Sequence, residues 1–451
     1  MTATSAAATV NWADITAELA GIEVITEATQ LTRLSLDYYH FSPILQPQLA
    51  DKRADLVVRP TTEAEVLRVA QLCVHHRLPL TVRGAGTGNY GQCVPLAGGI
   101  VLDTTRLNQV RWLRDGVACV EPGVRLAACD RQAQPQGWEW RMYPSTYRTA
   151  TIGGFIGGGS GGIGSINYGQ LRDRGNLQAV RVVTLEDEPR IVELRGDEVQ
   201  KVNHAYGTNG IITELEVPLA PAQPWAEVIV VFDNFLTAAR FGQALSDADG
   251  LAKKLVSIHA DPIPRYFTAL QNALPAGKAA AILLIGEPSL ETFRELVREY
   301  DGEVTYCKTA QEAQKGTSLV EFTWNHTTLH ARSADSSLTY LQTFYFDLER
   351  VERLYRQFDG AEVTMHLEFM RVGGRAIPAG LQLVRYSTPE RLQAIIQAHE
   401  AAGAAIANPH TYILEDGGRK VIDPVQLAFK RQVDPYGLLN PGKMRAWWES
   451  A

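Results

Sequence analysis

The chain has 451 residues, of which 45% are hydrophobic and 21% charged, an ordinary composition for a globular protein. At about 100–200 residues per domain, this length accommodates two or three domains. Lys and Arg number 43 against 50 Asp and Glu, and the net charge of −7 argues against nucleic acid as a partner. The apolar run 279–285 is too short to cross a bilayer, and residues 1–6 lack the features of a signal peptide. We therefore expect a cytoplasmic protein without a transmembrane segment, either free or peripheral to a membrane.

The cysteines give no sign of a disulfide framework or of an iron–sulfur or zinc site, because they are scattered and form no C-x-x-C pair. We interpret each as a small buried hydrophobic residue. Cys93 is the one possible exception to this interpretation, since it follows a glycine-rich turn. The five cysteines are Cys73, Cys93, Cys119, Cys129 and Cys307.

A strand–helix–strand pattern follows a helical lead-in over residues 1–50. Residues 56–58 are predicted as a strand, and Thr62 with Glu65 forms a capping box for the next helix. The strand at 80–82 then leads into a glycine-rich turn. Further strands are predicted over residues 117–120, 179–185 and 211–217.

Three prolines within residues 218–224 mark a domain boundary. Beyond it, strands alternate with helices at 290–300 and 390–402, the second with Thr388 as N-cap and Pro389 at its first position. This pattern predicts an α+β domain, with an antiparallel sheet and helices on one face. Its strands are predicted over residues 228–232, 280–285 and 380–386.

Glycine is concentrated in two segments, 84–88 and 153–164. The second has eight glycines in twelve positions, but Ile and Phe interrupt them at regular intervals, which favours a buried, ordered segment over a linker. Glycine permits positive φ and close approach of a ligand, and successive backbone N–H groups bind anions. We therefore expect both segments to surround a dinucleotide pyrophosphate.

Two standard phosphate-binding motifs match formally but fail in context. Residues 86–91 fit G-x-G-x-x-G, yet the residues after them cannot open the helix whose N-terminus should face the pyrophosphate. Residues 437–444 fit G-x-x-x-x-G-K, but Met444 stands where a P-loop needs a hydroxyl for Mg²⁺. The chain is predicted to bind phosphate through a loop of another kind.

Six segments, taken together and in order, resemble the vanillyl-alcohol oxidase / para-cresol methylhydroxylase (PCMH) flavoproteins. Within that superfamily the resemblance is to the glycolate oxidase and D-lactate dehydrogenase branch. It covers residues 55–222 and 425–445 well and the stretch between them poorly. The segments are 79–88, 121–124, 143–146, 152–169, 210–214 and 434–443.

The resemblance implies an α+β fold with a two-subdomain, PCMH-type FAD-binding domain over residues 1–222, its core at 50–222. A substrate or cap domain would cover 223–410, and the segment 411–451 would return to the FAD domain. The residues that it implies for FAD binding are Arg83, Gly84, Ala85, Gly86, Thr87, Gly88, Asn89, Pro144, Ser145, Thr149, Gly153, Gly154, Ser160, Gly161, Gly162, Tyr168, Gly210, Ile211 and Asn440. No histidine lies between His76 and His204, so we expect the FAD to be non-covalent.

Oxidation of a hydroxyl carbon needs a base for the hydroxyl proton and a cation for any substrate carboxylate. His410 is the candidate base, because it stands where 2-hydroxyacid dehydrogenases of the family carry Glu-His-Gly, and histidine suits proton transfer near neutral pH. A structural histidine at a proline turn is the open alternative. Tyr412, two residues on, is a second candidate donor.

The resemblance breaks down at the family's metal motif, His-x-Gly-Asp-Gly-Asn-x-His. His366 matches its first position and stays a candidate catalytic residue, but Gly373 stands where the second histidine should be. His366 and Glu368 alone do not make a metal site, so we predict no metal. The stretch 324–326 resembles the family's Leu-Trp-x-x-Arg, with Asn325 or His326 near the arginine's place. The remaining candidate carboxylate anchors are Arg332, Arg371, Arg375 and Arg385.

The sequence therefore predicts an FAD-dependent oxidoreductase acting on CH–OH donors. Its small-molecule substrate would be a 2-hydroxy acid such as glycolate or D-lactate, with hydride transfer to flavin N5 and an unidentified electron acceptor. Two alternatives stay open: a catalytically reduced FAD-binding partner subunit of a multi-subunit oxidase, and a sugar- or lactone-type oxidase. A partner subunit or a homo-oligomer is compatible with the sequence.

Overall fold

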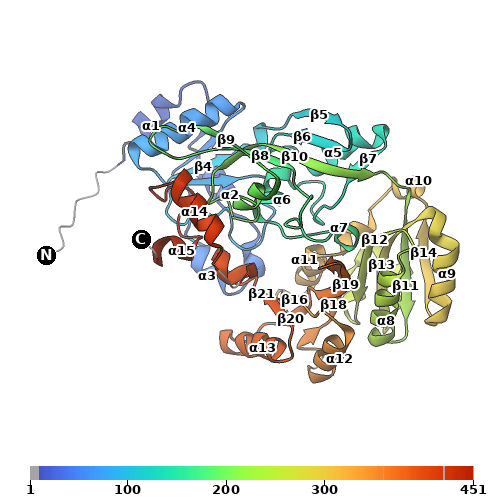
Figure 1. Cartoon of the computed structure of the whole chain (residues 1–451). Coiled ribbons are helices and arrows are strands. Elements are labelled where there is room, and N and C mark those ends of the chain that lie inside the picture. The colour runs from blue at the N-terminus through green and yellow to red at the C-terminus, as the bar shows by residue number, and fades with distance from the viewer. Residues whose placement is uncertain (1–9, 359, 420–421, 450–451) are drawn as a thin grey trace.

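The computed structural model describes residues 10–358, 360–419 and 422–449. Figure 1 shows two lobes, and the C-terminal helices, in red, lie against the lobe that the blue and cyan segments build. We call residues 10–221 the first lobe and residues 225–407 the second lobe. Between them, strand β10 ends at Pro221 and β11 begins at Trp225, so we propose the domain boundary here.

The first lobe contains two sheets. The smaller has the order β1-β2-β4-β3, and its last three strands are parallel. The larger runs β5-β6-β10-β8-β9, with β7 also paired to β10. The smaller sheet consists of β1 (Glu23–Ile25), β2 (Leu56–Arg59), β3 (Leu80–Arg83) and β4 (Ile100–Asp103); the larger of β5 (Val110–Arg114), β6 (Val117–Val120), β7 (Trp138–Trp140), β8 (Ala179–Val183), β9 (Ile191–Arg195) and β10 (Ile211–Pro221).

The second lobe is built on an antiparallel sheet of order β14-β11-β13-β12-β18-β19-β16-β21. Three short strands, β15 (Leu338–Tyr340), β20 (Leu383–Arg385) and β17 (Val363–Thr364), form a separate small sheet. The strands of the large sheet are β11 (Trp225–Phe232), β12 (Lys253–His259), β13 (Ala279–Gly286), β14 (Glu303–Lys308), β16 (Gln342–Phe344), β18 (His366–Val372), β19 (Arg375–Gly380) and β21 (Ala405–Ala407).

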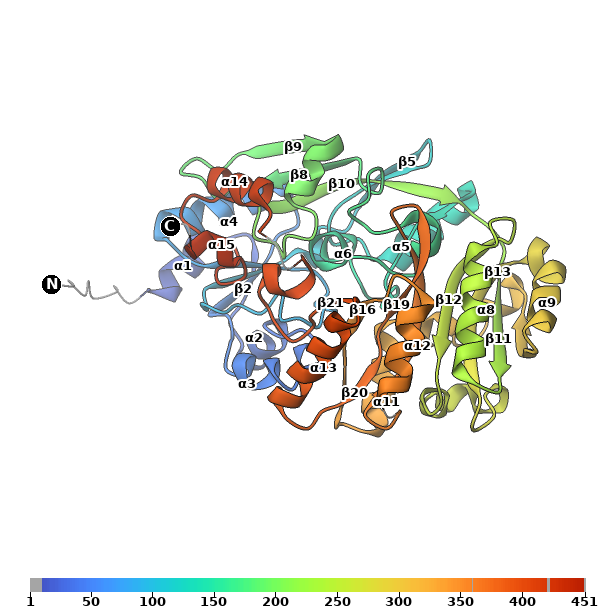
Figure 2. The same cartoon turned by 60° about the horizontal axis from the view of Figure 1, so that its bottom comes forward.

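Both faces of this large sheet are apolar, because alternate residues of its strands enter two different cores. Val228 and Val230 pack with helices α8, α9 and α12, whereas Ile229 packs with α11 and short 3₁₀ turns on the opposite face. The predicted α+β fold with an antiparallel sheet is confirmed, but helix α11 lies on the face expected to lack helices. Figure 2 shows α8 and α12 in front of the sheet, with their axes roughly along the direction of its strands.

The helices follow the predicted start signals closely. Thr62 caps α4 by accepting a hydrogen bond from Glu65 N, although the Glu65 carboxylate returns to Thr61 rather than to Thr62. Thr388 caps α13, with Pro389 as its first residue. The helices are α1 (Trp12–Glu18), α2 (Ala28–Leu34), α3 (Leu45–Leu49), α4 (Glu63–His76), α5 (Leu126–Ala133), α6 (Ile152–Gly158), α7 (Ser165–Tyr168), α8 (Phe235–Asp247), α9 (Leu290–Glu299), α10 (Ala310–Ala313), α11 (Asn325–Ala334), α12 (Leu348–Gln357), α13 (Pro389–Ala401), α14 (Pro424–Val433) and α15 (Arg445–Glu449). None of these described helices is long and apolar enough to cross a membrane.

A buried ion pair joins the two lobes. Lys254 of β12 donates to the Glu139 carboxylate of β7 at 2.7 Å and to the Trp140 carbonyl at 2.9 Å, and Trp225 Nε1 donates to the same carboxylate. The Lys254 and Glu139 side chains are 3% and 6% exposed. A charge buried this deeply depends on its partner, so the pair fixes how the lobes meet.

Replacing Lys254 by Met should destabilise the protein by about 3–5 kcal/mol, because Glu139 would stay buried without its cation. Urea unfolding followed by tryptophan fluorescence measures the change. Lys278→Met is the matched control: its partner Asp233 is exposed, so little stability should be lost. Equal effects of the two substitutions would contradict a lobe-joining role for Lys254.

Candidate functional site

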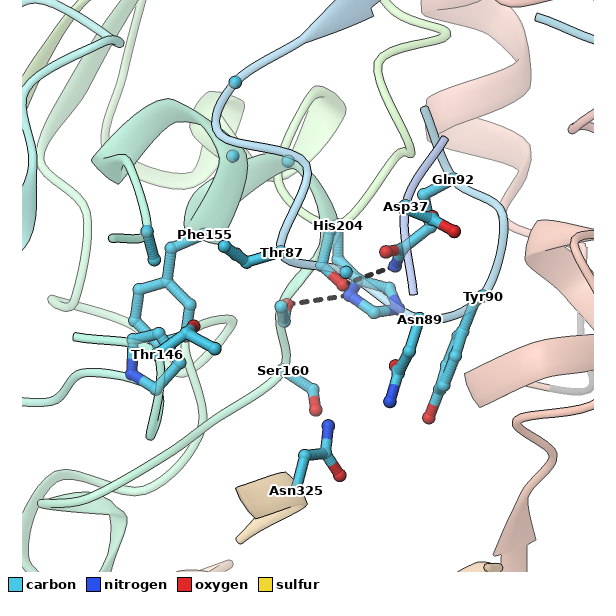
Figure 3. Close-up of a pocket in the computed structure, with 18 of the residues that line it drawn as sticks. Asp37, Thr87, Asn89, Tyr90, Gln92, Thr146, Phe155, Ser160, His204 and Asn325 are labelled. Carbon is cyan, nitrogen blue, oxygen red and sulfur yellow. Dashed lines mark hydrogen bonds between the residues drawn. The ribbon is translucent and has the colours of Figure 1, made fainter. Parts of the chain in front are cut away.

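A cavity of about 610 Å³ lies between the two lobes and is lined by residues of both. The first lobe contributes the loop after β3, helix α6 with the segments on either side of it, and residues 202–212. The second lobe contributes the start of α11 and the ends of β16, β18, β19 and β21. Figure 3 shows that the polar ends of Ser160, from the first lobe, and Asn325, from the second, face one another.

The loop after β3 presents main-chain N–H groups that the folded chain leaves free. Among the described residues, the structure records no acceptor for the amides of residues 85–89. Gly86 has φ +67°, and a Cβ there would lie 2.1 Å from Nη2 of the buried Arg83. Free amides in a loop that leaves no room for side chains make a concave site for an anion.

Helix α6 is the second glycine-rich wall and is tied to the first. Gln92 Nε2 donates to the Gly158 carbonyl at 2.8 Å, and His204 Nδ1 contacts the Gly159 carbonyl at 2.7 Å. A Cβ on Gly153 would lie 2.9 Å from the Pro122 backbone, so only glycine lets α6 pack at this distance. The sequence predicted an ordered segment here, and the structure makes it a short helix.

Several buried polar atoms at the cavity have no hydrogen-bond partner within the described part of the chain. A buried polar group without a hydrogen bond is costly, so such a cluster indicates a polar ligand. Among the described residues that line the cavity, six atoms have no partner: Asp37 Oδ2, Tyr90 Oη, Thr151 Oγ1, Tyr206 Oη, Trp324 Nε1 and Asn325 Oδ1.

Two buried cations lie behind the loop. Arg83 donates to the Leu36 carbonyl and to Cys93 Sγ, and Lys443 donates to the Gly91 carbonyl. Burial raises the pKa of Asp37 to about 6 against the opposing charges of Lys443 and Arg83, and burial lowers the pKa of Lys443 to about 7. These cations favour an anion on the cavity side of the loop.

On the side of the second lobe, one carboxylate joins an arginine and a histidine. Glu321 precedes α11 and lies 3.1 Å from His326 Nδ1 through Oε2, and 3.4 Å from Arg148 Nε through Oε1. All three residues line the cavity. The hydrogen bond from His326 lowers the pKa of Glu321, with a further contribution from the charge of Arg148, so this carboxylate is ionised near neutral pH.

The comparisons with known proteins agree with this geometry. Residues 54–193 match the FAD binding domain family. A glycolate oxidase subunit GlcD of Bacillus subtilis is 25% identical over 431 residues, 87% of this chain and 89% of that protein. A D-lactate dehydrogenase of Anaerostipes hadrus is 31% identical over 195 residues, 40% of each protein. The chain is thus similar to FAD-linked oxidoreductases over most of its length, and its residues 54–193 match an FAD-binding domain.

Solved structures with a similar fold extend the likeness over most of the chain. An alkyldihydroxyacetonephosphate synthase has a TM-score of 0.70 at 14% identity, over 93% of this chain and 82% of that one. A variant of the BBE-like 1 protein of Physcomitrella patens has a TM-score of 0.65 at 13% identity, over 95% of this chain and 98% of that one. At these identities the likeness concerns the fold.

FAD is therefore the cofactor of this FAD-linked oxidoreductase, and the cavity fits it. The free amides of residues 85–89 suit the pyrophosphate, and the unpaired buried atoms supply hydrogen-bonding partners for other polar groups of a dinucleotide. When bound, FAD supplies the two-electron oxidation chemistry, and the protein contributes binding, orientation and electrostatics.

Most of the residues predicted to bind FAD line the cavity, and the others are absent from its described lining. Asn440 Nδ2 donates to the Gln92 and Tyr206 carbonyls, so it supports the loop from outside the cavity. Ile211 is buried in β10, and its neighbour Ile212 lines the cavity instead. The predicted residues that line it are Gly84, Ala85, Gly86, Thr87, Gly88, Asn89, Pro144, Ser145, Thr149, Gly153, Gly154, Ser160, Gly161 and Gly210; among the described lining residues Arg83, Gly162, Tyr168, Ile211 and Asn440 are absent.

His410 does not fit the predicted role of base. It is absent from the described residues that line the cavity, and its two ring nitrogens already contact Ser42 Oγ and the Tyr340 carbonyl. Burial lowers its pKa to about 4. Tyr412 is absent from the lining as well and lies against Lys443. The geometry supports the alternative of a structural histidine at a proline turn.

Like His410, His366 is absent from the described residues that line the cavity; it is buried inside the second lobe. Its ring stacks on His259 with centroids 4.5 Å apart, and its Nε2 contacts Glu368 Oε1 at 2.9 Å. No group of three metal-ligating side chains occurs among the described residues. The candidate carboxylate anchors Arg332, Arg371, Arg375 and Arg385 are likewise missing from the described lining residues.

Sequence reasoning missed several lining residues that come from distant segments. Asp37 belongs to the helical lead-in, and His204 and Tyr206 belong to no recognisable motif. Arg148 lies between Ser145 and Thr149, which were predicted to bind FAD, but was not itself predicted. A sequence signal existed only for Asn325 and His326, which occupy the place of the family's arginine.

Replacing Gly86 by Ala should weaken FAD binding by at least about tenfold, because a left-handed conformation costs a non-glycine residue about 1–2 kcal/mol and the new Cβ would displace Arg83. Fluorescence titration of the apoprotein with FAD measures the affinity. The control is Gly250→Ala, since Gly250 is exposed and nothing lies within 4 Å of the added Cβ. Unchanged FAD affinity in Gly86→Ala would contradict the loop assignment.

Acid should destabilise the protein partly through His410. Its pKa is about 4 in the folded state and about 6.5 when unfolded, so the unfolded state binds more protons between these values. The stability is therefore fully present above pH 6.5 and falls as the pH drops toward 4, by up to about 3 kcal/mol. His410→Gln should flatten this decline in urea unfolding free energies measured from about pH 7 to about pH 4.5. If the unfolding free energy of the variant fell with pH as steeply as that of the wild type, His410 would not be held neutral in the folded state.

Proposed function

We propose that this FAD-dependent oxidoreductase oxidises a small 2-hydroxy acid, such as D-lactate or glycolate, to the corresponding 2-oxo acid. The observation that supports it best is the continuity of the cavity, from the free amides of the loop to the Glu321, His326 and Arg148 cluster at the second lobe. The relatives named glycolate oxidase subunit and D-lactate dehydrogenase favour the same substrate class.

Arg148 takes the place of the anchors expected from the sequence. The Arg148 side chain is 61% exposed. Among the described residues, Glu321 is its one recorded ion-pair partner. Arg172, the other arginine of the described lining, is already paired with Asp423. A guanidinium at the cavity wall can receive a substrate carboxylate through two parallel hydrogen bonds.

We also infer that the FAD is held without a covalent bond. Cys93 lines the cavity, but burial raises the pKa of its thiol to about 11, so the nucleophilic thiolate is scarce. His204 already contacts the Gly159 carbonyl through Nδ1. Acid precipitation should therefore release yellow FAD into the supernatant.

A second candidate, a partner subunit of a larger oxidase, is favoured by one specific observation. The relative that aligns over 87% of this chain is named as a subunit. In that case, the chain would bind FAD and contribute to an assembly without turning over substrate alone. Co-purification with a second polypeptide, together with no reduction of the flavin by any acid, would favour this candidate.

The decisive experiment is anaerobic flavin reduction in the purified protein. D-Lactate or glycolate should bleach the visible absorption of the oxidised flavin, whereas 1,2-propanediol, which lacks the carboxylate, should not. Arg148→Gln should raise the substrate concentration needed for half-maximal reduction about 10–100-fold, because a charge-assisted hydrogen bond is worth about 1.5–3 kcal/mol.

The matched control is Arg174→Gln, which removes an exposed arginine that pairs with Asp197 and is not part of the described lining. It should behave as wild type. Faster bleaching by neutral polyols than by any 2-hydroxy acid would overturn the substrate assignment and favour the sugar- or lactone-type alternative.

A further inference from the structure

His326 and Glu321 bring titratable groups to the cavity from the second lobe. Among the described residues that the second lobe contributes to the lining, they are the titratable side chains; the rest are apolar, hydroxyl, amide or indole groups. His410, Tyr412 and His366, which the sequence favoured, are all outside this lining. A base that reaches a substrate from the second lobe must therefore come from this pair.

The chain fixes the position of His326 through a strained turn. Trp324 has φ +51°, which is unusual for a bulky residue, and it caps the N-terminus of α11. Its backbone N–H donates to Glu368 Oε1 at 2.6 Å, and the same oxygen accepts from Ser257 Oγ at 2.8 Å. Strained backbone persists only where its surroundings hold it, so this network sets where α11 begins.

The pairing with Glu321 determines which nitrogen of the imidazole is free. Nδ1 lies 3.1 Å from Glu321 Oε2, and because a carboxylate oxygen can only accept, this contact favours the proton of a neutral ring on Nδ1 and the lone pair on Nε2. Among the described residues, no hydrogen-bond partner of His326 Nε2 is recorded. The His326 side chain is 15% exposed, so its free nitrogen lies at a cavity wall rather than in open solvent.

The same carboxylate sets Arg148 beside this ring. Arg148 pairs with Oε1 and His326 with Oε2, so Glu321 places a cation and a base next to each other. A 2-hydroxy acid carries its hydroxyl on the carbon that bears the carboxylate. Its two polar groups therefore match two neighbouring partners, one cationic and one basic.

We propose that His326 is the catalytic base of this enzyme and that Glu321 is the positioning residue that holds its tautomer. This inference rests on the proposed function. The hydroxyl proton passes to His326 Nε2 as the C–O bond becomes C=O, and the hydride of the same carbon, with its electron pair, is accepted by oxidised FAD. The products are the 2-oxo acid, protonated His326 and two-electron-reduced FAD, which a downstream acceptor reoxidises.

The test uses single-turnover reduction of the FAD-loaded protein by D-lactate or glycolate in a stopped-flow spectrometer. His326→Gln should lower the limiting rate about 10²–10⁴-fold, the usual contribution of a general base. FAD content and the substrate concentration for half-maximal rate should stay within about twofold, because a base acts mainly on the step itself. Glu321→Gln should lower the rate less, since the ring remains present.

A pH profile distinguishes a base from a merely structural residue. The titratable groups near the His326 ring are Glu321 from the preceding turn, Arg148 from the first lobe and His330 from the next turn of α11, whose own pKa is lowered by burial. Wild-type reduction should slow at low pH, where the ring is protonated, and His326→Gln should lose this dependence. Added imidazole should restore part of the rate to His326→Ala.

The outcomes separate this inference from the proposed function. Reduction of the wild type by a 2-hydroxy acid, with His326→Gln equally fast, would overturn the base assignment and leave the substrate class standing. Loss of rate in His410→Gln instead, at normal FAD content, would return the role to His410. Failure of every 2-hydroxy acid to reduce the wild type would overturn both.

Discussion

The site depends on a loop that is held from behind by the far end of the chain. Glycines make the loop after β3 open to a ligand, and they also make it costly to order. The C-terminal segment supplies the order: Leu80 N donates to the Leu438 carbonyl, Asn440 holds the Gln92 carbonyl, and Lys443 holds that of Gly91. The last two contacts span 348 and 352 residues of sequence, so the FAD site is complete only when nearly the whole chain has folded.

The two lobes divide the chemistry between them. The first lobe offers backbone amides and buried cations, which recognise an anion without regard to what is being oxidised. The second lobe offers side chains of mixed character from α11 and four strand ends, and these can differ among proteins of one fold without disturbing the cofactor. The buried pair of Lys254 and Glu139 keeps these two halves of one cavity in register.

The sequence predicted the first lobe far better than the second, for a physical reason. Loops that contact a pyrophosphate through the backbone need glycine at fixed positions, such as Gly86, and this requirement is visible in the sequence. Side chains that meet a substrate need only the right position in space, which many segments can supply. His410 and His366 had suitable chemistry and neighbours, but each is buried with its polar atoms engaged. Arg148 carried no sequence signal, and its proximity to His326 became visible only when folding brought both side chains to one carboxylate.

The eroded metal motif has a structural counterpart in the network around Glu368. Its Oε1 accepts from Trp324 N and Ser257 Oγ and contacts His366, whereas its Oε2 has no partner among the described residues. A carboxyl group with three polar neighbours can hold a strained turn without a metal ion. Helix α11 begins directly after this turn, at Asn325, and His326 is its second residue. The network of Ser257, His366 and Glu368 therefore bears on the position of His326 through two residues of backbone, although none of these three side chains is among the described lining residues of the cavity.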